Sequence, residues 1–179
     1  KRRTQRDTDV RDPEADTNAA LTPIPRSFVI RRGKVPSALR DLVPDLRHML
    51  LPHTAVNLKE RRSNTLKDYL DVAGRLGVTH FWLVSATDLG AYLRLIRAPR
   101  GPTLTFKLLA YSLARDVKQI QRRPLSMEPL DFREAPLLVQ SNFSKHKNEA
   151  QAIMAAVFQN IFPPINVRTA NLAMMRRVV

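Results

Sequence analysis

Three arginines recur at a spacing of three in a short, proline-rich stretch of the chain. Arg94, Arg97 and Arg100 lead into an alternating apolar run that ends at residue 106. Each guanidinium presents a rigid fork of donors that matches the oxygens of a phosphate group. Three of them near one backbone corner predict a phosphate-binding surface. The alternative is an edge strand whose arginines only discourage aggregation.

The charge of the whole chain also favours a polyanionic partner. Thirty Lys and Arg stand against sixteen Asp and Glu, which gives a net charge of +14 over 179 residues. The excess is concentrated, because residues 27–62 hold eight basic and three acidic residues, and residues 90–123 hold eight basic and one acidic. Neutralising phosphates releases condensed counterions, so two such segments indicate a nucleic-acid-binding surface. Aromatic residues, at 6%, are too few for a platform that stacks on single-stranded bases.

Residues that would support catalysis or metal binding are scarce. The chain has no cysteine, and its four histidines, His48, His53, His80 and His146, lack the spacing of a metal site. The five glycines form no phosphate-binding loop, dinucleotide fingerprint or nucleophile elbow. No apolar run approaches the roughly 20 residues that cross a bilayer. We therefore expect a protein that is not an enzyme, with no metal, cofactor, small-molecule substrate or membrane partner.

Strand and helix patterns alternate along residues 27–179, which predicts an α/β (α+β) sandwich. Residues 1–26 are charged and rich in Asp, Thr and Pro, and are expected to form a flexible arm. Strands are predicted at residues 27–31, 54–58, 78–85, 91–97, 103–108, 137–141 and 171–179. Helices are predicted to start at Ser37, at Ser63 or Asn64, and at Ser112, with a last helix at residues 148–162.

Four local expectations follow from residue type. Pro44 should kink or split the first helix, because proline removes a backbone donor. Gly74 and Gly77 should end the second helix through a left-handed cap. Residues 74–77 also match the loop of KH domains, but that loop joins two helices and a strand is predicted here. The strand at residues 78–85 should be central, and residues 94 and 97 should point to opposite faces of theirs.

Seven short segments carry a recognisable family pattern. They are SFVIRRG at 27–33, LKER at 58–61, LKDY at 66–69, GVTH at 77–80, LRLIR at 93–97, PRGPTLTF at 99–106 and FQNIFP at 158–163. Together they resemble the Brix domain family, most closely its Peter Pan (suppressor of Swi4) branch. The resemblance implies a non-enzymatic, nucleolar factor that assembles the large (60S) ribosomal subunit during pre-rRNA processing.

The resemblance also implies a fold and partners. Brix domains consist of two α/β halves, similar to the anticodon-binding domains of class II aminoacyl-tRNA synthetases. Residues 27–179 would then be the first half and the start of the second, in a chain truncated at its C-terminus. The implied partners are pre-rRNA of the large subunit, ribosomal proteins and other pre-60S assembly factors, including a small dedicated partner protein.

Ten basic residues are the expected RNA contacts. They are Arg31, Arg32, Lys34, Lys59, Arg61, Arg62, Arg94, Arg97, Arg100 and Lys107. We expect them to hold the phosphate backbone of folded pre-rRNA and to recognise shape more than base sequence. Two alternatives remain: a protein-interaction scaffold with incidental RNA contact, and a tRNA-binding module suggested by fold analogy alone.

Overall fold

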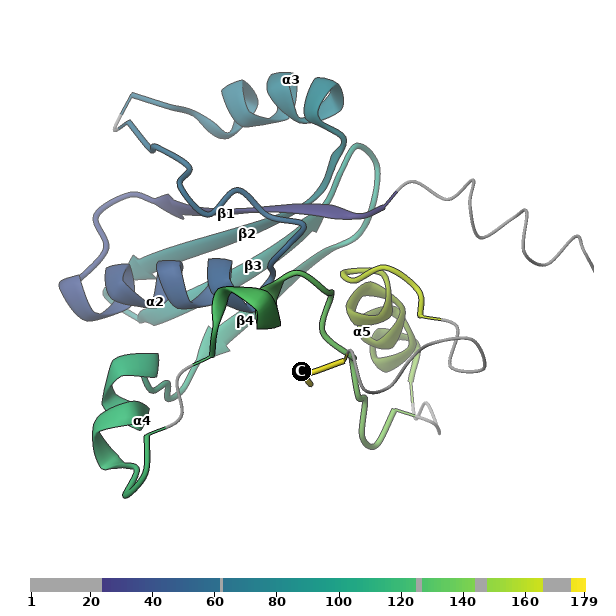
Figure 1. Cartoon of the computed structure of the whole chain (residues 1–179). Helices are drawn as coiled ribbons and strands as arrows, with labels where there is room; N and C mark the ends of the chain where they lie inside the picture. The colour runs from purple at the N-terminus through teal and green to yellow at the C-terminus, as the bar shows by residue number, and fades with distance from the viewer. Residues whose placement is uncertain (1–23, 62, 125–126, 144–147, 166–174) are drawn as a thin grey trace, which may run out of the picture.

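A four-stranded sheet in the order β1-β2-β3-β4 is the centre of the structure, a computed structural model (Figure 1). The described residues are 24–61, 63–124, 127–143, 148–165 and 175–179. The strands are β1 (Arg26–Arg32), β2 (Val78–Thr87), β3 (Gly90–Arg97) and β4 (Thr103–Leu108). β1 pairs with β2 in parallel, and the other neighbours pair antiparallel. β2 and β3 form a hairpin closed between Thr87 and Gly90.

Helices lie on both faces of this sheet, which confirms the mixed α/β sandwich. They are α2 (Ser37–Met49), α3 (Leu66–Leu76), α4 (Ala114–Ile120), the 3-10 helix η1 (Pro129–Phe132) and α5 (Glu149–Gln159). In Figure 1, α3 lies on one side of the sheet, and α2 and α5 lie on the other, while α4 stands apart. The expected similarity to synthetase domains stays a prediction.

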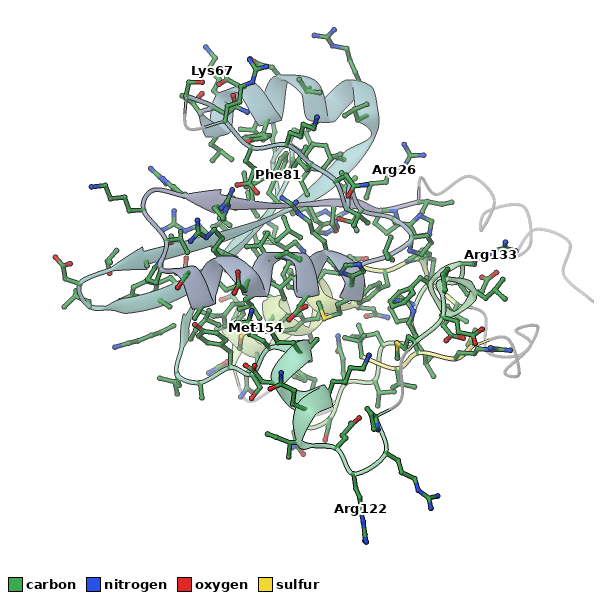
Figure 2. The ribbon with its side chains drawn as sticks, turned by 60° about the vertical axis from the view of Figure 1, so that its left-hand side comes forward. Arg26, Lys67, Phe81, Arg122, Arg133 and Met154 are labelled. Atoms are coloured by element: carbon green, nitrogen blue, oxygen red, sulfur yellow. The ribbon has the colours of Figure 1, made fainter. Side chains whose placement is uncertain are left out.

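The alternation of side chains along the strands builds two cores. Val29, Trp82 and Leu95 pack on the α2 side, together with Ile161 beyond the end of α5. Phe28, Phe81 and Leu83 pack on the other side against Ala73 of α3, and Figure 2 shows Phe81 between the sheet and that helix. Because its neighbours cover both faces, β2 is the buried central strand that its apolar sequence predicts.

α3 covers only the β1 and β2 half of its side of the sheet. The residues packed there come mostly from β1, β2 and α3. On β4 the side chains that face this side, Thr103, Thr105 and Lys107, are all exposed. No helix of the described ranges packs over them, so half of one sheet face is open.

The strand predicted at residues 54–58 is wrong, because only Thr54 forms a bridge, to Ser27. A buried arginine on α2 takes the place of a strand along the outer edge of β1. Arg47 donates to the carbonyl of Val29 at 2.8 Å and to two carbonyls in residues 56–58. It also pairs with Glu60 at 2.6 Å, and Glu60 accepts from the backbone N–H of Arg31. Side-chain donors and acceptors thus satisfy backbone groups on the outer edge of β1, where hydrogen bonds to a further strand were expected.

The predicted helix caps are also wrong in detail. Helix α2 follows Pro36 and runs through Pro44 without a split, α3 follows Thr65, and α4 follows Leu113. Pro44 is exposed, as is Arg40 four residues earlier, so water can reach the carbonyl that proline leaves without a donor. At α3, Thr65 and Asp68 form a reciprocal capping box.

Only one of the two predicted glycine terminators acts as one. Gly77 adopts φ 65° and caps α3, which is the left-handed conformation expected there. Gly74 instead lies inside the helix. The helix therefore continues for two residues beyond the first glycine, and Gly77 follows as its cap.

The last third of the chain departs most from prediction. Helix α4 has no buried residue. The strand predicted at residues 137–141 is reduced to one parallel bridge, between Leu137 and Val178. Of residues 171–179, the first four lie outside the described residues. Asn148 does begin α5, with its side chain accepting from the backbone N–H of Gln151.

Arg177 joins this last segment to the end of α2. Its guanidinium donates to the backbone carbonyls of His48, Met49 and Leu51, which lie at the C-terminal end of that helix. It also lies 4.8 Å from the ring centroid of Phe132. Burial lowers the pKa of Arg177. A cation from the far end of the chain thus completes α2 where helix carbonyls lack donors.

Candidate nucleic-acid interface

The open half of the sheet gathers three of the ten predicted RNA contacts. Arg94 of β3 lies between Leu83 of β2 and Thr105 of β4, and Lys107 of β4 lies beside Tyr92. The open sheet face is defined here as the following side chains: Arg32, Ser85, Tyr92, Arg94, Thr103, Thr105 and Lys107. Period-two alternation puts them all on the α3 side, beyond the part that α3 covers.

Two guanidiniums of this face flank a shallow hollow of about 300 Å³. It is lined by Arg32, Leu83, Ser85, Ala86, Thr87 and Arg94. Arg32 is directly beside Ser85 across the parallel pair of β1 and β2. Neither Arg32 nor Arg94 has an acidic partner among the residues that the structure describes. Two unneutralised forks and the hydroxyl of Ser85 offer donors that a phosphate requires, whereas the hydroxyl of Thr87 donates to the carbonyl of Gly90.

Arg97 faces the opposite side of the sheet, as its position in the strand predicts. It pairs with His80, whose neighbours on that face are Trp82 and Leu95. A Cβ added at Gly101 would lie 2.4 Å from the Cβ of Arg97, so the corner closes tightly over this side chain. Arg100 is exposed between the two prolines of the corner. The three arginines of residues 94–100 therefore do not form one surface.

Burial and Arg97 together keep His80 neutral. The pKa of His80 is lowered to about 4, mainly because burial disfavours the imidazolium and also because Arg97 repels it. Its Nδ1 lies 2.8 Å from the hydroxyl of Thr79, while its Nε2 has no partner. His80 is thus a core histidine, as expected for a polar residue within the most apolar strand.

The remaining predicted contacts occupy loops. Lys34 is exposed in the turn after β1, and Lys59 and Arg61 are exposed in the segment before α3. Arg62 lies outside the described residues. Arg31 is different, because its Nε contacts a carboxylate oxygen of Glu60 at 3.1 Å. Arg31 belongs with Arg47 to the edge of β1, and its charge is already partly compensated.

Sequence reasoning missed the hydroxyl side chains of the hollow. Ser85 and Thr87 share the parity of Leu83 along β2, so their common face could have been inferred. Their position beside Arg32 depends on the parallel pairing of β1 with β2, whose paired residues there are 53 positions apart in the sequence, and no local pattern indicates that pairing. No local pattern indicates the role of Arg47 either, because its partners come from β1 and from the segment at residues 56–60.

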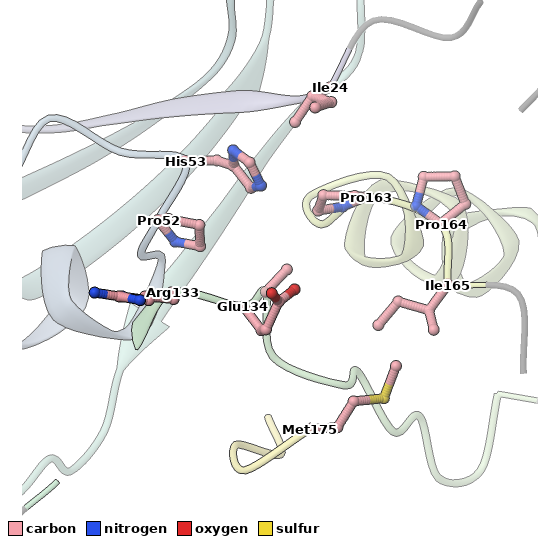
Figure 3. Close-up of a pocket in the computed structure, with 10 residues that line it drawn as sticks. Ile24, Pro52, His53, Arg133, Glu134, Pro163, Pro164, Ile165 and Met175 are labelled. Carbon is pink, nitrogen blue, oxygen red and sulfur yellow. The ribbon is translucent and has the colours of Figure 1, made fainter. Parts of the chain in front are cut away.

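A second hollow, of about 570 Å³, lies near the start of β1 and the end of α5 (Figure 3). Prolines and aliphatic side chains line most of it, with His53 and Glu134 among them. Burial is the main cause that lowers the pKa of His53, with Arg26 adding to it and Glu134 opposing it. The described residues show no hydrogen bond between the two side chains. This arrangement lacks a nucleophile or an oriented acid–base pair.

Within the described ranges, no three side chains of the metal-ligating types gather closely enough to hold an ion. In the same ranges, no helix has the length and apolar character needed to cross a membrane.

Comparison with known proteins identifies the family. The model of the Brix domain matches residues 33–179. The chain is 47% identical over 161 residues to a Brix domain-containing protein of Schizosaccharomyces pombe, covering 87% of this chain and 41% of that protein. It is 45% identical over 156 residues to a Peter Pan-like protein of Arabidopsis thaliana, covering 87% of this chain and 45% of that one.

A third relative carries a functional name. The chain is 41% identical over 180 residues to the ribosome biogenesis protein SSF1 of Saccharomyces cerevisiae, covering 90% of this chain and 40% of that protein. The chain thus spans less than half the length of each of these relatives.

Proposed function

Because the chain belongs to the Brix domain family, we propose that it serves ribosome biogenesis by holding the phosphate backbone of folded pre-rRNA on its open sheet face. A relative named for ribosome biogenesis shares 41% identity with it. The proposed RNA is pre-rRNA of the large (60S) subunit. The proposed activity is non-enzymatic binding during pre-rRNA processing in the nucleolus.

The pair Arg32 and Arg94 is the observation that carries this proposal. Both side chains border one hollow, and the structure gives neither an acidic partner in its described part. Lys107 adds a third charge on the neighbouring strand. Cations that fold without a counterion are available to a ligand, whereas Arg31 and Arg47 are engaged by Glu60.

The side chains of this face favour phosphate contact over base recognition. Sequence-specific binding to single-stranded RNA on a sheet uses several aromatic rings that stack on bases. The open sheet face has one aromatic side chain, Tyr92, among hydroxyls and cations. Charged and hydroxyl donors suit phosphate and sugar oxygens, so the expected readout is the shape of a folded RNA.

Two further elements of the proposal concern the other contacts. Arg97, the last residue of β3, and Arg100, in the corner that follows, are proposed to hold a separate group of phosphates, since Arg97 faces away from Arg94. Lys34, Lys59 and Arg61 are proposed to extend the contact through exposed loops.

Ribosomal proteins and other pre-60S factors, including a small dedicated partner protein, are the proposed protein partners.

The salt dependence of binding to large-subunit pre-rRNA fragments tests the open sheet face. We expect the triple variant Arg32→Gln, Arg94→Gln and Lys107→Gln to bind more weakly, because three phosphate contacts are lost. Each contact contributes about 0.7 to 0.9 to the slope of log affinity against log salt, so the magnitude of the slope should fall by about 2.1 to 2.7. Fluorescence titrations over a range of KCl concentrations measure both quantities.

A matched triple variant removes the same charge elsewhere. Arg40→Gln, Lys67→Gln and Arg75→Gln change exposed residues of α2 and α3. This control should keep the slope of the unaltered chain to within about one contact. Equal losses in both variants would mean that net charge alone binds the RNA, and the proposal would fail.

A further inference from the structure

We infer that the segment of residues 109–120, which follows β4 and includes α4, docks a segment of another protein that alternates acidic and apolar side chains. This segment is called the apolar arm below. The inference rests on exposed aliphatic side chains, on the surrounding charge and on the way the arm is anchored. It stands whether or not the open sheet face binds RNA.

The apolar arm exposes more aliphatic surface than a free domain should. Leu109 is 89% exposed and Ile120 is 85% exposed, and Tyr111 and Val117 are each more than two-fifths exposed. Four large apolar side chains are exposed within twelve residues of sequence, whereas exposed apolar side chains are ordinarily scattered singly. Apolar patches with a charged rim are typical of protein–protein contact sites.

The apolar spacing on α4 is that of a helix with one buried side. Leu113, Val117 and Ile120 recur at intervals of four and three, which places them along one stripe. Leu113, just before the helix, is buried in the core. Val117 and Ile120 continue the stripe into solvent, since no residue of α4 is buried. The stripe therefore has a covered beginning and an uncovered end, as expected for a surface that a partner completes.

The arm is held in place against α2 rather than left loose. The backbone N–H of Ala114 donates to a carboxylate oxygen of Asp45 at 2.8 Å. Arg115 pairs with Asp41 at 3.1 Å. Both acids belong to α2, so the start of α4 is fixed by two carboxylates and by buried Leu113. A preformed surface binds a partner at a smaller entropic cost than a flexible one does.

Charge decides the chemistry of the expected partner. Residues 109–123 hold four basic residues and one acidic residue, and Arg115 is already paired with Asp41 and Asp116. Arg122 and Arg123 are exposed, and Figure 2 shows Arg122 pointing away from the body at the far end of the arm. Acidic side chains in a partner would neutralise this rim while its apolar ones cover Leu109 and Ile120. RNA is a poorer fit, because aliphatic side chains gain little against phosphates and offer no ring for stacking.

The outer edge of β4 adjoins this patch and extends the surface. β4 is the last strand of the sheet, and in the described residues no strand pairs with its outer side. Leu109 follows its final residue directly. An extended partner segment can thus use the free backbone groups of β4 and reach the arm, which is the mode of strand addition.

Site-specific photocrosslinking in cells tests this inference on the protein in its native assemblies. A benzophenone amino acid is placed at position 109 or 120, and at position 89 as the control. Leu89 is 78% exposed at the turn after β2, so it is equally apolar but lies outside the arm. We expect positions 109 and 120 to crosslink to one protein segment with an acidic and apolar sequence, at least tenfold more than position 89. Nuclease treatment should leave these products intact.

Variants then separate docking from general exposure. Val117→Ser with Ile120→Ser should reduce the product formed at position 109 at least fivefold, while Leu89→Ser should leave it unchanged. The double variant, Leu89→Ser and the unaltered chain should have the same unfolding midpoint, because the altered side chains are exposed. Products that nuclease removes, products within this chain, a neutral or basic crosslinked segment, or equal yields at position 89 would each overturn the inference.

Discussion

Arg47 and Arg177 carry positive charge into the interior, in contrast to Arg32 and Arg94 on the open sheet face. Each buried guanidinium donates to backbone carbonyls of several segments, so its hydrogen bonds replace those it loses to water. Composition counts all four arginines alike toward +14. Their surroundings divide them into two that stabilise the fold and two that are available to a ligand.

At Arg47, the expected effect of a substitution is large. Arg47→Met should lower the free energy of unfolding by about 3 kcal/mol, because the largely buried Glu60 would keep only Arg31 as a charged partner. The carbonyl of Val29 would also lose a donor. Urea denaturation followed by circular dichroism measures the change.

Arg40→Met is the control on the same helix, where the side chain is exposed. It should shift the free energy of unfolding by no more than about 0.5 kcal/mol. Similar small effects of both substitutions would contradict the structural role assigned to Arg47.

His80 makes stability depend on pH. Its pKa is about 4 in the folded protein and 6.5 is its ordinary value, so the unfolded chain binds the proton more tightly. The free energy of unfolding should therefore fall as the pH drops from about 6.5 towards 4. Urea midpoints of the unaltered chain and of His80→Phe, compared across this window, should show a smaller decline in the variant.

The neighbouring arginine offers an independent check on this histidine. Arg97→Gln should raise the pKa of His80, because Arg97 is one of the two causes that lower it. Burial remains, so the pKa should stay below its ordinary value. Titration of the imidazole by nuclear magnetic resonance measures this, and an unchanged or lowered pKa would contradict the pairing of β2 with β3 at this position.

Among the elements, the strands agree with prediction better than the helix ends do. Alternation in residues 91–97 and 103–108 depends only on the period of a strand, and it placed Arg94 and Arg97 on opposite faces correctly. Caps depend on one residue among several similar candidates, and Thr65 acts in place of Ser63 or Asn64. The strand expected at residues 54–58 failed because distant Arg47 satisfies its carbonyls.

The two glycines of α3 should respond to alanine with opposite signs. A Cβ at either Gly74 or Gly77 would meet no atom within 4 Å, so only the backbone decides. Gly74→Ala should stabilise by about 0.5 to 1 kcal/mol, because alanine favours a helix interior. Gly77→Ala should destabilise by about 1 kcal/mol, because φ is 65° there. Thermal or urea unfolding of both variants measures the pair, and equal signs would contradict the assigned end of α3.

For the molecule as a whole, helices cover the two faces of the sheet unequally. One face is packed by α2 and α5, and the other has α3 on half of its width (Figure 1). The sequence predicted a basic surface and an α/β sandwich from charge and periodicity. Which cations share a face with a hollow depends on the pairing of β1 with β2, and that pairing is a nonlocal property.

The contact between Arg177 and the end of α2 has a consequence for synthesis of the protein. The carbonyls of His48, Met49 and Leu51 receive their donor from a residue made 126 to 129 positions later. At about 5 to 20 residues per second, a ribosome needs roughly 6 to 26 s to add that stretch. During this interval the carbonyl of His48 still has the backbone N–H of Leu51 as a donor, whereas those of Met49 and Leu51 have water. The end of α2 should therefore gain its full set of donors late in translation.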